Sequence, residues 1–212
     1  MDFQKSNNKL IFMRIFTIAT LLIISLGCTD ETVDLLPTVT KNVSDLHAPT
    51  TSQPGSPPSG DFVLFNLMDE TQVFDNSWDL AFRGTTILIN GGNKGADDEP
   101  ERTGNGGGYV AIGAYQDIKS VNIEEIKQDE ITSKAIPTGS GNGWYNYDFQ
   151  SHTISAIPGR TLVIKTHDGK YAKLEILCYY KGCPNTPSMT SDSQYYTFNY
   201  TLQPNSGIIN FD

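Results

Sequence analysis

From residue 61 to the C-terminus, hydrophobic and polar residues follow the pattern of short β-strands separated by turn residues. Trp78, Leu80 and Phe82 occupy alternate positions, which is typical of a strand with one buried face. Further strand-like segments lie at 62–67, 85–90, 109–115, 145–147, 153–157, 161–166, 170–179 and 194–202. The pattern predicts an all-β, or nearly all-β, single domain of antiparallel strands over residues 61–212.

The connections between these strands are of three kinds. His167-Asp168-Gly169 joins two strand segments, and Asp-Gly in such a place indicates a β-hairpin because glycine accepts a positive φ. One short helix is expected near residues 122–129. Two long glycine-containing loops, 91–108 and 137–143, are of a length that is usually functional or mobile in a compact domain. We interpret the charged part of the first loop as solvated.

The first 27 residues have the features of a signal peptide. Basic residues precede an apolar run over 15–26, which is shorter than the ~20 residues of a membrane-spanning helix. Gly27-Cys28 follows this run and resembles the end of a bacterial lipobox, in which the cysteine becomes the first residue and carries acyl chains such as palmitate. The alternative is an ordinary secretory signal that happens to contain a cysteine.

Residues 28–60 lack an apolar periodicity and are rich in Pro, Ser and Thr, so we expect an extended tether. The folded part is expected to begin near Asp61. Acyl chains on Cys28 would anchor the protein to a membrane. Asp30 and Glu31 follow the cysteine, and in some Gram-negative lipoproteins such acidic residues accompany export to the outer cell surface. We therefore expect a lipid-anchored protein of the outer membrane, facing the cell surface.

Composition and motifs exclude several functions. The net charge of −9 argues against a nucleic-acid partner, because binding to phosphates needs clustered Lys and Arg. The acidic stretch at 95–101 lacks the spacing of a Ca²⁺ loop. The chain shows no zinc-protease, serine-hydrolase or phosphate-loop motif. Without a nucleophile–base set, we do not expect an enzyme.

Two cysteines remain besides Cys28. Cys178 and Cys183 lie at the end of one strand and in the loop after it. In an oxidising compartment they could form a small-loop disulfide. The alternative is two free thiols, one of them buried. Metal binding by this pair would need two more ligands, which the neighbourhood does not offer.

The three histidines differ in their surroundings. His47 lies in the expected tether, and His167 lies at a hairpin turn, where we expect it to be solvated. His152 lies in a loop between two strands, just after an aromatic segment that includes Trp144 and Tyr145. Either His152 has a binding role or it is incidentally exposed.

Several segments in their order and spacing resemble the HmuY family of haem-binding bacterial surface lipoproteins. They are 76–83 (NSWDLAFR), 141–145 (GNGWY), 157–160 (IPGR), 162–174 (LVIKTHDGKYAKL) and 194–200 (QYYTFNY). The resemblance covers about residue 61 to the C-terminus. It implies an all-β fold and capture of haem at the surface of a Gram-negative bacterium. It also implies that haem is handed to a TonB-dependent outer-membrane receptor.

In this family, two side chains bind the haem iron axially, and the resemblance implies candidates for them. His152 lies after the Gly-Trp motif, where one family ligand is found, and Trp144 and Tyr145 would contact the ligand. The segment that matches the second ligand position, 102–108, contains neither His nor Met. The second ligand is then Met189, a tyrosine, or none.

Two other hypotheses stay open. The fold could hold a different ligand, either an iron-free porphyrin or a glycan. It could also belong to an accessory protein of the receptor that binds no small molecule.

Overall fold

We describe residues 34–51 and 56–212 in a computed structural model. The folded unit spans Leu35–Asp212. The expected signal peptide, the lipidation site Cys28 and the acidic residues after it lie outside the described residues. Within the described residues, the structure contains no helix that is long and apolar enough to cross a membrane.

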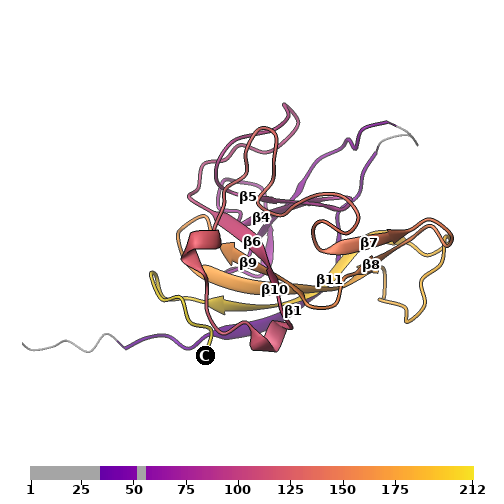
Figure 1. The fold of residues 1–212 in the computed structure, drawn as a ribbon. Helices are drawn as coiled ribbons and strands as arrows, with labels where there is room; N and C mark the ends of the chain where they lie inside the picture. Colours follow the sequence, from indigo (N-terminus) through magenta and orange to yellow (C-terminus); the bar gives the residue numbers. More distant parts are fainter. Residues whose placement is uncertain (1–33, 52–55) are drawn as a thin grey trace, which may run out of the picture. The chain divides into compact units, whose positions relative to one another are not determined.

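Two antiparallel sheets and a hairpin make up the fold (Figure 1). The large sheet has the order β1 (Val39–His47), β11 (Ser193–Gln203), β10 (Tyr171–Tyr180), β9 (Arg160–Lys165), β6 (Gly107–Ile112). The small sheet has the order β3 (Thr71–Val73), β2 (Val63–Asn66), β4 (Leu80–Arg83), β5 (Thr86–Ile89). β7 (Tyr145–Asp148) and β8 (Thr153–Ala156) form the hairpin. The predicted nearly all-β, antiparallel fold class is confirmed.

Most predicted strand segments correspond to observed strands whose ends differ by a few residues. β3 was not predicted. The helix expected near 122–129 is reduced to a single 3-10 turn, Ile123–Glu125, and a second such turn lies at Tyr115–Asp117.

The first strand corrects the domain boundary. Val39–His47 pairs with β11 from Val39 opposite Leu202 to His47 opposite Tyr195, so the prediction of a tether over 28–60 is wrong for this stretch. The strand was missed because it lies at the sheet edge and contains few apolar residues. Polar side chains of β1 instead bond to β11, as Thr40 does to Thr201 over 2.9 Å. The folded part therefore begins before Asp61.

The core lies between the two sheets and is rich in aromatic residues, because each sheet directs one apolar face inward. The largest fully buried side chains in it include Trp144, Tyr196, Tyr200, Phe82 and Phe198. The buried phenols are paired: the Tyr196 hydroxyl donates to the Gly84 carbonyl over 2.7 Å, and the Tyr200 hydroxyl donates to the Leu67 carbonyl over 2.8 Å. These bonds join the last strand of the large sheet to segments that flank the small sheet.

Candidate functional site

His152 lies at the tip of the β7–β8 hairpin. The strands pair up to Asp148 opposite Thr153, so residues 149–152 form the connecting loop. His152 is exposed and has a φ of 54°, a left-handed conformation that non-glycine residues adopt uncommonly. Its Nδ1 lies 2.7 Å from the Tyr147 hydroxyl. The imidazole is therefore held by one ring nitrogen.

Two aromatic residues share the hairpin tip with this histidine. Phe149 is 79% exposed and packs edge-to-face on Tyr147, with ring centroids 4.9 Å apart. We call Tyr147, Phe149 and His152 the hairpin-tip cluster. An apolar ring in water beside a fixed imidazole is an arrangement that suits contact with a flat ligand.

Trp144 and Tyr145 belong to the core and not to this surface, and their contact with a ligand stays a prediction. They are only 2% and 9% exposed. The Trp144 indole Nε1 donates to the Thr85 carbonyl over 3.0 Å, and its ring packs on Tyr179 and Tyr196. Both residues lie where the hairpin leaves the core, so they anchor β7 and leave the tip exposed.

Met189 lies in the loop between β10 and β11 and is 70% exposed. The β7–β8 hairpin is attached at the same end of β10, because the Ile154 N–H donates to the Tyr180 hydroxyl over 2.7 Å. Figure 1 shows this loop and the hairpin tip at one end of the large sheet. Both predicted iron ligands thus lie at that end, but no hydrogen bond of the described residues joins Met189 to His152.

Cys178 and Cys183 are both free thiols, so the predicted disulfide is not formed in this structure. Cys178 is buried and its thiol points to the Tyr180 carbonyl at 3.6 Å, whereas Cys183 is exposed. Desolvation and the neighbouring Cys178 thiol raise the pKa of Cys183 to about 11. The alternative of two free thiols, one buried, describes the structure.

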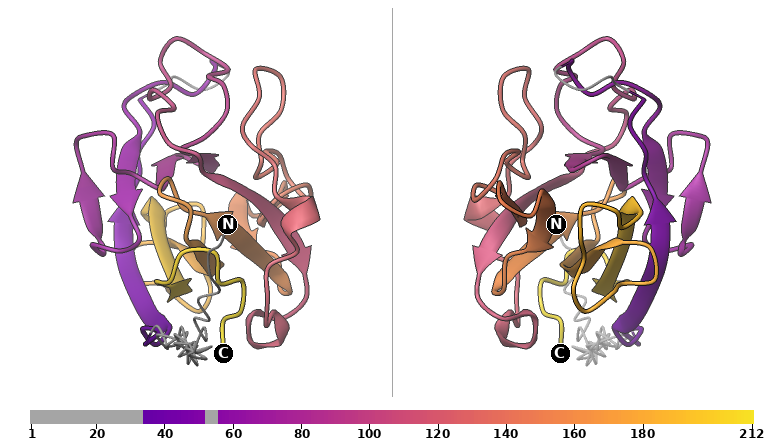
Figure 2. Two further views of the ribbon diagram at one scale, coloured as in Figure 1. Left: turned by 90° about the vertical axis from the view of Figure 1, so that its left-hand side faces the viewer. Right: turned by 90° about the vertical axis from the view of Figure 1, so that its right-hand side faces the viewer.

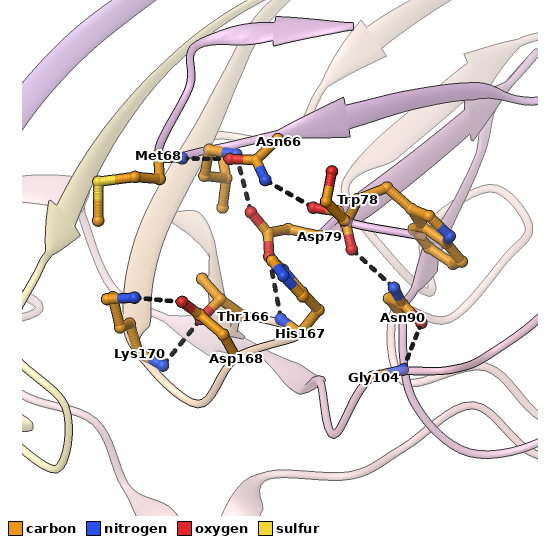
Figure 3. A network of polar contacts seen from close by, with 12 residues as sticks. Asn66, Met68, Trp78, Asp79, Asn90, Gly104, Thr166, His167, Asp168 and Lys170 are labelled. Carbon is orange, nitrogen blue, oxygen red and sulfur yellow. Dashed lines mark hydrogen bonds and ion pairs between the residues drawn. The ribbon is translucent and has the colours of Figure 1, made fainter. Parts of the chain in front are cut away.

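His167 is not solvated as expected. Its ring Nδ1 lies 2.7 Å from Asp79 Oδ1, and its backbone N–H donates to the same oxygen over 2.9 Å (Figure 3). The other oxygen of the buried Asp79 accepts the Leu67 N–H over 2.8 Å. The bond to Asp79 raises the pKa of His167 above its usual value, against the effect of burial. The aspartate of the Trp-Asp motif therefore fastens the β9–β10 turn to the small sheet.

Asn90 extends this network to the first long loop. Its side-chain oxygen accepts the backbone N–H groups of Thr103 and Gly104, each over 2.9 Å. A Cβ at Gly104 would lie 2.6 Å from the His167 Cβ, so glycine is required for this approach. Nothing in the sequence pattern around Asn90 indicated the contact, because its partners lie more than ten residues away.

Loop 91–108 is also less solvated than predicted. Arg102 Nη2 contacts Glu99 at 2.8 Å and Asp129 at 3.0 Å, and Lys134 contacts Glu99 at 2.8 Å. Burial raises the pKa of Asp129; for Glu99, the Gly95 N–H and Lys134 outweigh burial and lower its pKa. Figure 2 shows the loop beside the segment that carries Asp129 and Lys134. In the part of the chain that the structure describes, no group of three or more His, Cys, Asp or Glu side chains is arranged to hold a metal ion.

His47 lies at the end of β1 and not in a tether. It is exposed and stacks on Tyr195, with ring centroids 4.2 Å apart and planes 9° from parallel. The stack covers an end of the sheet edge. It lies on β1 and β11, and the hairpin-tip cluster lies on β7 and β8.

The fold is thus a two-sheet antiparallel β-domain whose exposed tip carries a fixed imidazole. A model of the family described as HmuY protein matches residues 58–200. Because the match spans more than half of the chain, the protein belongs to the HmuY family, as the sequence motifs predicted.

Three solved structures are similar to this chain. An apo HmuY analog from Tannerella forsythia is 12% identical, with 81% of this chain and 100% of that chain covered and a TM-score of 0.48. A lipoprotein candidate from Bacteroides fragilis is 14% identical (77% and 89% covered, TM-score 0.39). A candidate HmuY-like haem-binding protein from Bacteroides vulgatus is 12% identical (77% and 90% covered, TM-score 0.38). No curated protein matches the chain. Membership of the family rests on the family match.

Proposed function

We propose that this protein is a lipid-anchored surface protein that binds haem through His152 and hands it to a TonB-dependent outer-membrane receptor. Membership of the HmuY family supports haem as the ligand. The lipobox-like segment at Gly27-Cys28 supports anchoring at the outer membrane. The protein acts in binding and transfer, with no catalytic step.

The observation that carries the proposal is the geometry of His152. His152 ends the hairpin loop with a φ of 54°, and its imidazole is exposed at the tip, where a ligand can reach it. When the Nδ1–H of His152 donates a hydrogen bond to the Tyr147 hydroxyl oxygen, the other ring nitrogen, Nε2, keeps a lone pair. Neutral imidazole with such a lone pair is a common axial ligand of haem iron.

The other residues of the tip fit the same ligand. The exposed ring of Phe149 offers an apolar contact to a flat macrocycle. Met189 is the candidate for the second axial position, because a thioether is also a haem ligand and its loop leaves the same end of β10. The haem itself would supply only an iron centre with open axial positions.

Burial of Trp144 and Tyr145 removes the support for a glycan ligand, which required exposed aromatic rings. An iron-free porphyrin remains compatible with the fold and would not depend on His152.

A haem titration of the chain from residue 29 onward tests the proposal. The wild-type protein is expected to give a saturable Soret band with low-spin features. His152→Asn removes the ring but keeps a residue that tolerates positive φ, so loss of the band would report on the ligand and not on strain. Gln150→Ala, in the same loop, is the matched control and should retain the band.

A wild-type spectrum equal to that of free haem would reject haem as the ligand. A normal band in His152→Asn would reject His152 as the iron ligand. Met189→Leu is expected to shift the spectrum towards five-coordinate iron. Anchoring is tested separately by labelling cells with a radioactive fatty acid, which Cys28→Ser should abolish.

A further inference from the structure

The outward face of the small sheet is only partly covered. Trp78, Ala81 and Leu88 form a small buried cluster on it, against which Phe62, Leu64 and Val73 are partly buried. Arg102 from loop 91–108 lies over the Trp78 ring, 5.7 Å from its centroid. The part of the face formed by β4 and β5 is therefore closed, whereas the part formed by β2 and β3 is open.

An apolar cavity of about 540 Å³ lies on this open part. Its lining includes Pro49, Phe62, Leu64, Val73 and Phe74. The Phe74 ring is 96% exposed, so it lines a cavity without being covered by the protein. This volume lies within the ~300–1,000 Å³ typical of small-molecule sites.

A second, polar cavity of about 260 Å³ adjoins the first at Phe62, which lines both. The cations Arg83 and Lys134 line it, against one carboxylate, Glu99. Four hydroxyl side chains complete the polar part of the wall: Thr86, Thr132, Ser133 and Thr138. Lys134 is paired with Glu99 over 2.8 Å and Arg83 with Asp98 over 2.7 Å, so a ligand carboxylate would reach either cation by competing with a carboxylate of the protein.

Arg83 marks the junction of the two cavities. Its guanidinium lies over the Phe62 ring, 4.1 Å from the centroid, and its side chain is 9% exposed. Nη1 donates to the Gly60 carbonyl over 2.9 Å and to Asp98 over 2.7 Å. Nε is buried and has no hydrogen-bond partner among the residues that the structure describes. A buried donor left unpaired is unfavourable, which leaves this arginine able to bind a further acceptor after a small shift.

We propose that the two cavities form one site for an amphipathic carboxylate. The apolar body lies between Phe62 and Phe74, and the carboxylate lies at Arg83 and Lys134. Two sources share this chemistry: a long-chain fatty acid and the propionate side chains of a tetrapyrrole.

This site is separate from the hairpin tip. Neither cavity is lined by His152, Met189 or their neighbours in the hairpin-tip cluster. Asp98, whose side chain is 50% exposed, currently occupies one nitrogen of Arg83. A ligand carboxylate therefore competes with Asp98 for that nitrogen.

The test is fluorescence titration of the chain from residue 29 onward with a dansyl-labelled undecanoic acid, with the matching alcohol alongside. Lys134→Met should weaken binding of the acid about tenfold, and Asp98→Asn should strengthen it. Phe74→Ser should weaken it about fivefold, and because Phe74 is exposed this change does not threaten the fold. Lys119→Met and Ile112→Ser, an exposed cation and an exposed apolar residue elsewhere, are the matched controls.

Iron-free protoporphyrin forms the second arm of the test. The site is supported if the fatty acid, the porphyrin or both bind, with binding weakened by Lys134→Met and Phe74→Ser and strengthened by Asp98→Asn. Which of the two ligands binds identifies the source. Equal binding of the alcohol and the acid, or no effect of Lys134→Met and Asp98→Asn, would overturn the proposed site. So would failure of both ligands to bind at about 100 μM. His152→Asn should leave binding of the fatty acid unchanged, and Lys134→Met separates porphyrin bound in the cavities from porphyrin bound at the hairpin tip.

Discussion

The contact between Asp79 and the β9–β10 turn gives the sharpest prediction about stability. Asp79 is 1% exposed and accepts the Leu67 N–H, the His167 N–H and the His167 ring. Replacing Asp79 by alanine leaves two buried or half-buried backbone donors and one imidazole without their acceptor. The turn and the small sheet then lose a direct polar connection.

The size of the loss follows from these contacts. An unsatisfied buried donor costs about 1–3 kcal/mol, and removing one partner of a buried charged contact costs about 3–5 kcal/mol. We therefore expect Asp79→Ala to lower the free energy of unfolding by about 4 kcal/mol, a large part of the 5–15 kcal/mol typical of a domain. Asp168→Ala, which removes the exposed partner of Lys170 on the same turn, should cost less than about 1 kcal/mol.

The assay is urea unfolding followed by tryptophan fluorescence, because Trp78 and Trp144 are both buried and report on both sheets. Comparing the free energy of unfolding of wild type and His167→Gln at several pH values tests the contribution of the His167 charge. Its bond to Asp79 raises the pKa of His167 above 6.5, so the stabilisation from protonated His167 is fully present below about pH 6.5 and is lost as pH rises through the higher folded-state pKa. The stability difference between wild type and His167→Gln should shrink over that range.

Two results would refute this reasoning. The first is a loss of less than about 1 kcal/mol in Asp79→Ala, which would mean that the donors find other acceptors. The second is a difference between wild type and His167→Gln that grows as pH rises above 6.5.

Three further predictions concern other parts of the fold. Tyr196→Phe removes the hydroxyl that donates to the Gly84 carbonyl and should lower the free energy of unfolding by about 1–3 kcal/mol; an unchanged urea midpoint would contradict the buried bond. Burial and the Cys178 thiol raise the pKa of Cys183, so it should react with iodoacetamide about tenfold more slowly than a free thiol at pH 8, as followed by mass spectrometry. A fast reaction at pH 8 would show an unperturbed thiol. A chain that begins at residue 61 lacks β1 and should unfold at a clearly lower temperature in circular dichroism than one that begins at residue 35. Equal melting temperatures would mean that Val39–His47 does not stabilise the domain.

β2 and the strands from β4 onward could be predicted because runs of apolar residues lie between turn residues. The expected shared face of Trp78, Leu80 and Phe82 is wrong for Trp78, which precedes β4 and packs in the outward cluster, whereas Leu80 and Phe82 face the main core. β1 could not be predicted, because an edge strand needs few apolar residues and its partner β11 lies at the other end of the chain. The same separation hid the role of His167, whose partner Asp79 is 88 positions away. A short turn looks solvated when its long-range acceptor is unknown.

Burial was the property that the local pattern described least well. Trp144 and Tyr145 follow a glycine-rich loop, and sequence alone does not tell whether such rings point to solvent or to a core. In the structure, Thr85 supplies the acceptor that allows the Trp144 indole to be buried. His152 could be located because the loop between two predicted strands is exposed in almost any packing, although its link to Tyr147 could not.

If Cys28 carries the proposed lipid anchor, the early start of the fold limits the distance between the domain and the bilayer. Both backbone polar groups of Leu36 bond to the Asn205 side chain, over 3.0 and 2.7 Å, so the chain is already attached to the domain at that point. With Cys28 as the proposed anchor, the tether would consist only of residues 29–35, and its greatest length is about 25 Å. A tether over residues 29–60 would have had a greatest length of about 110 Å. A receptor that takes haem from such a protein would have to bind it close to the membrane surface. Inserting residues into the tether would then change the distance at which the two proteins can form a complex.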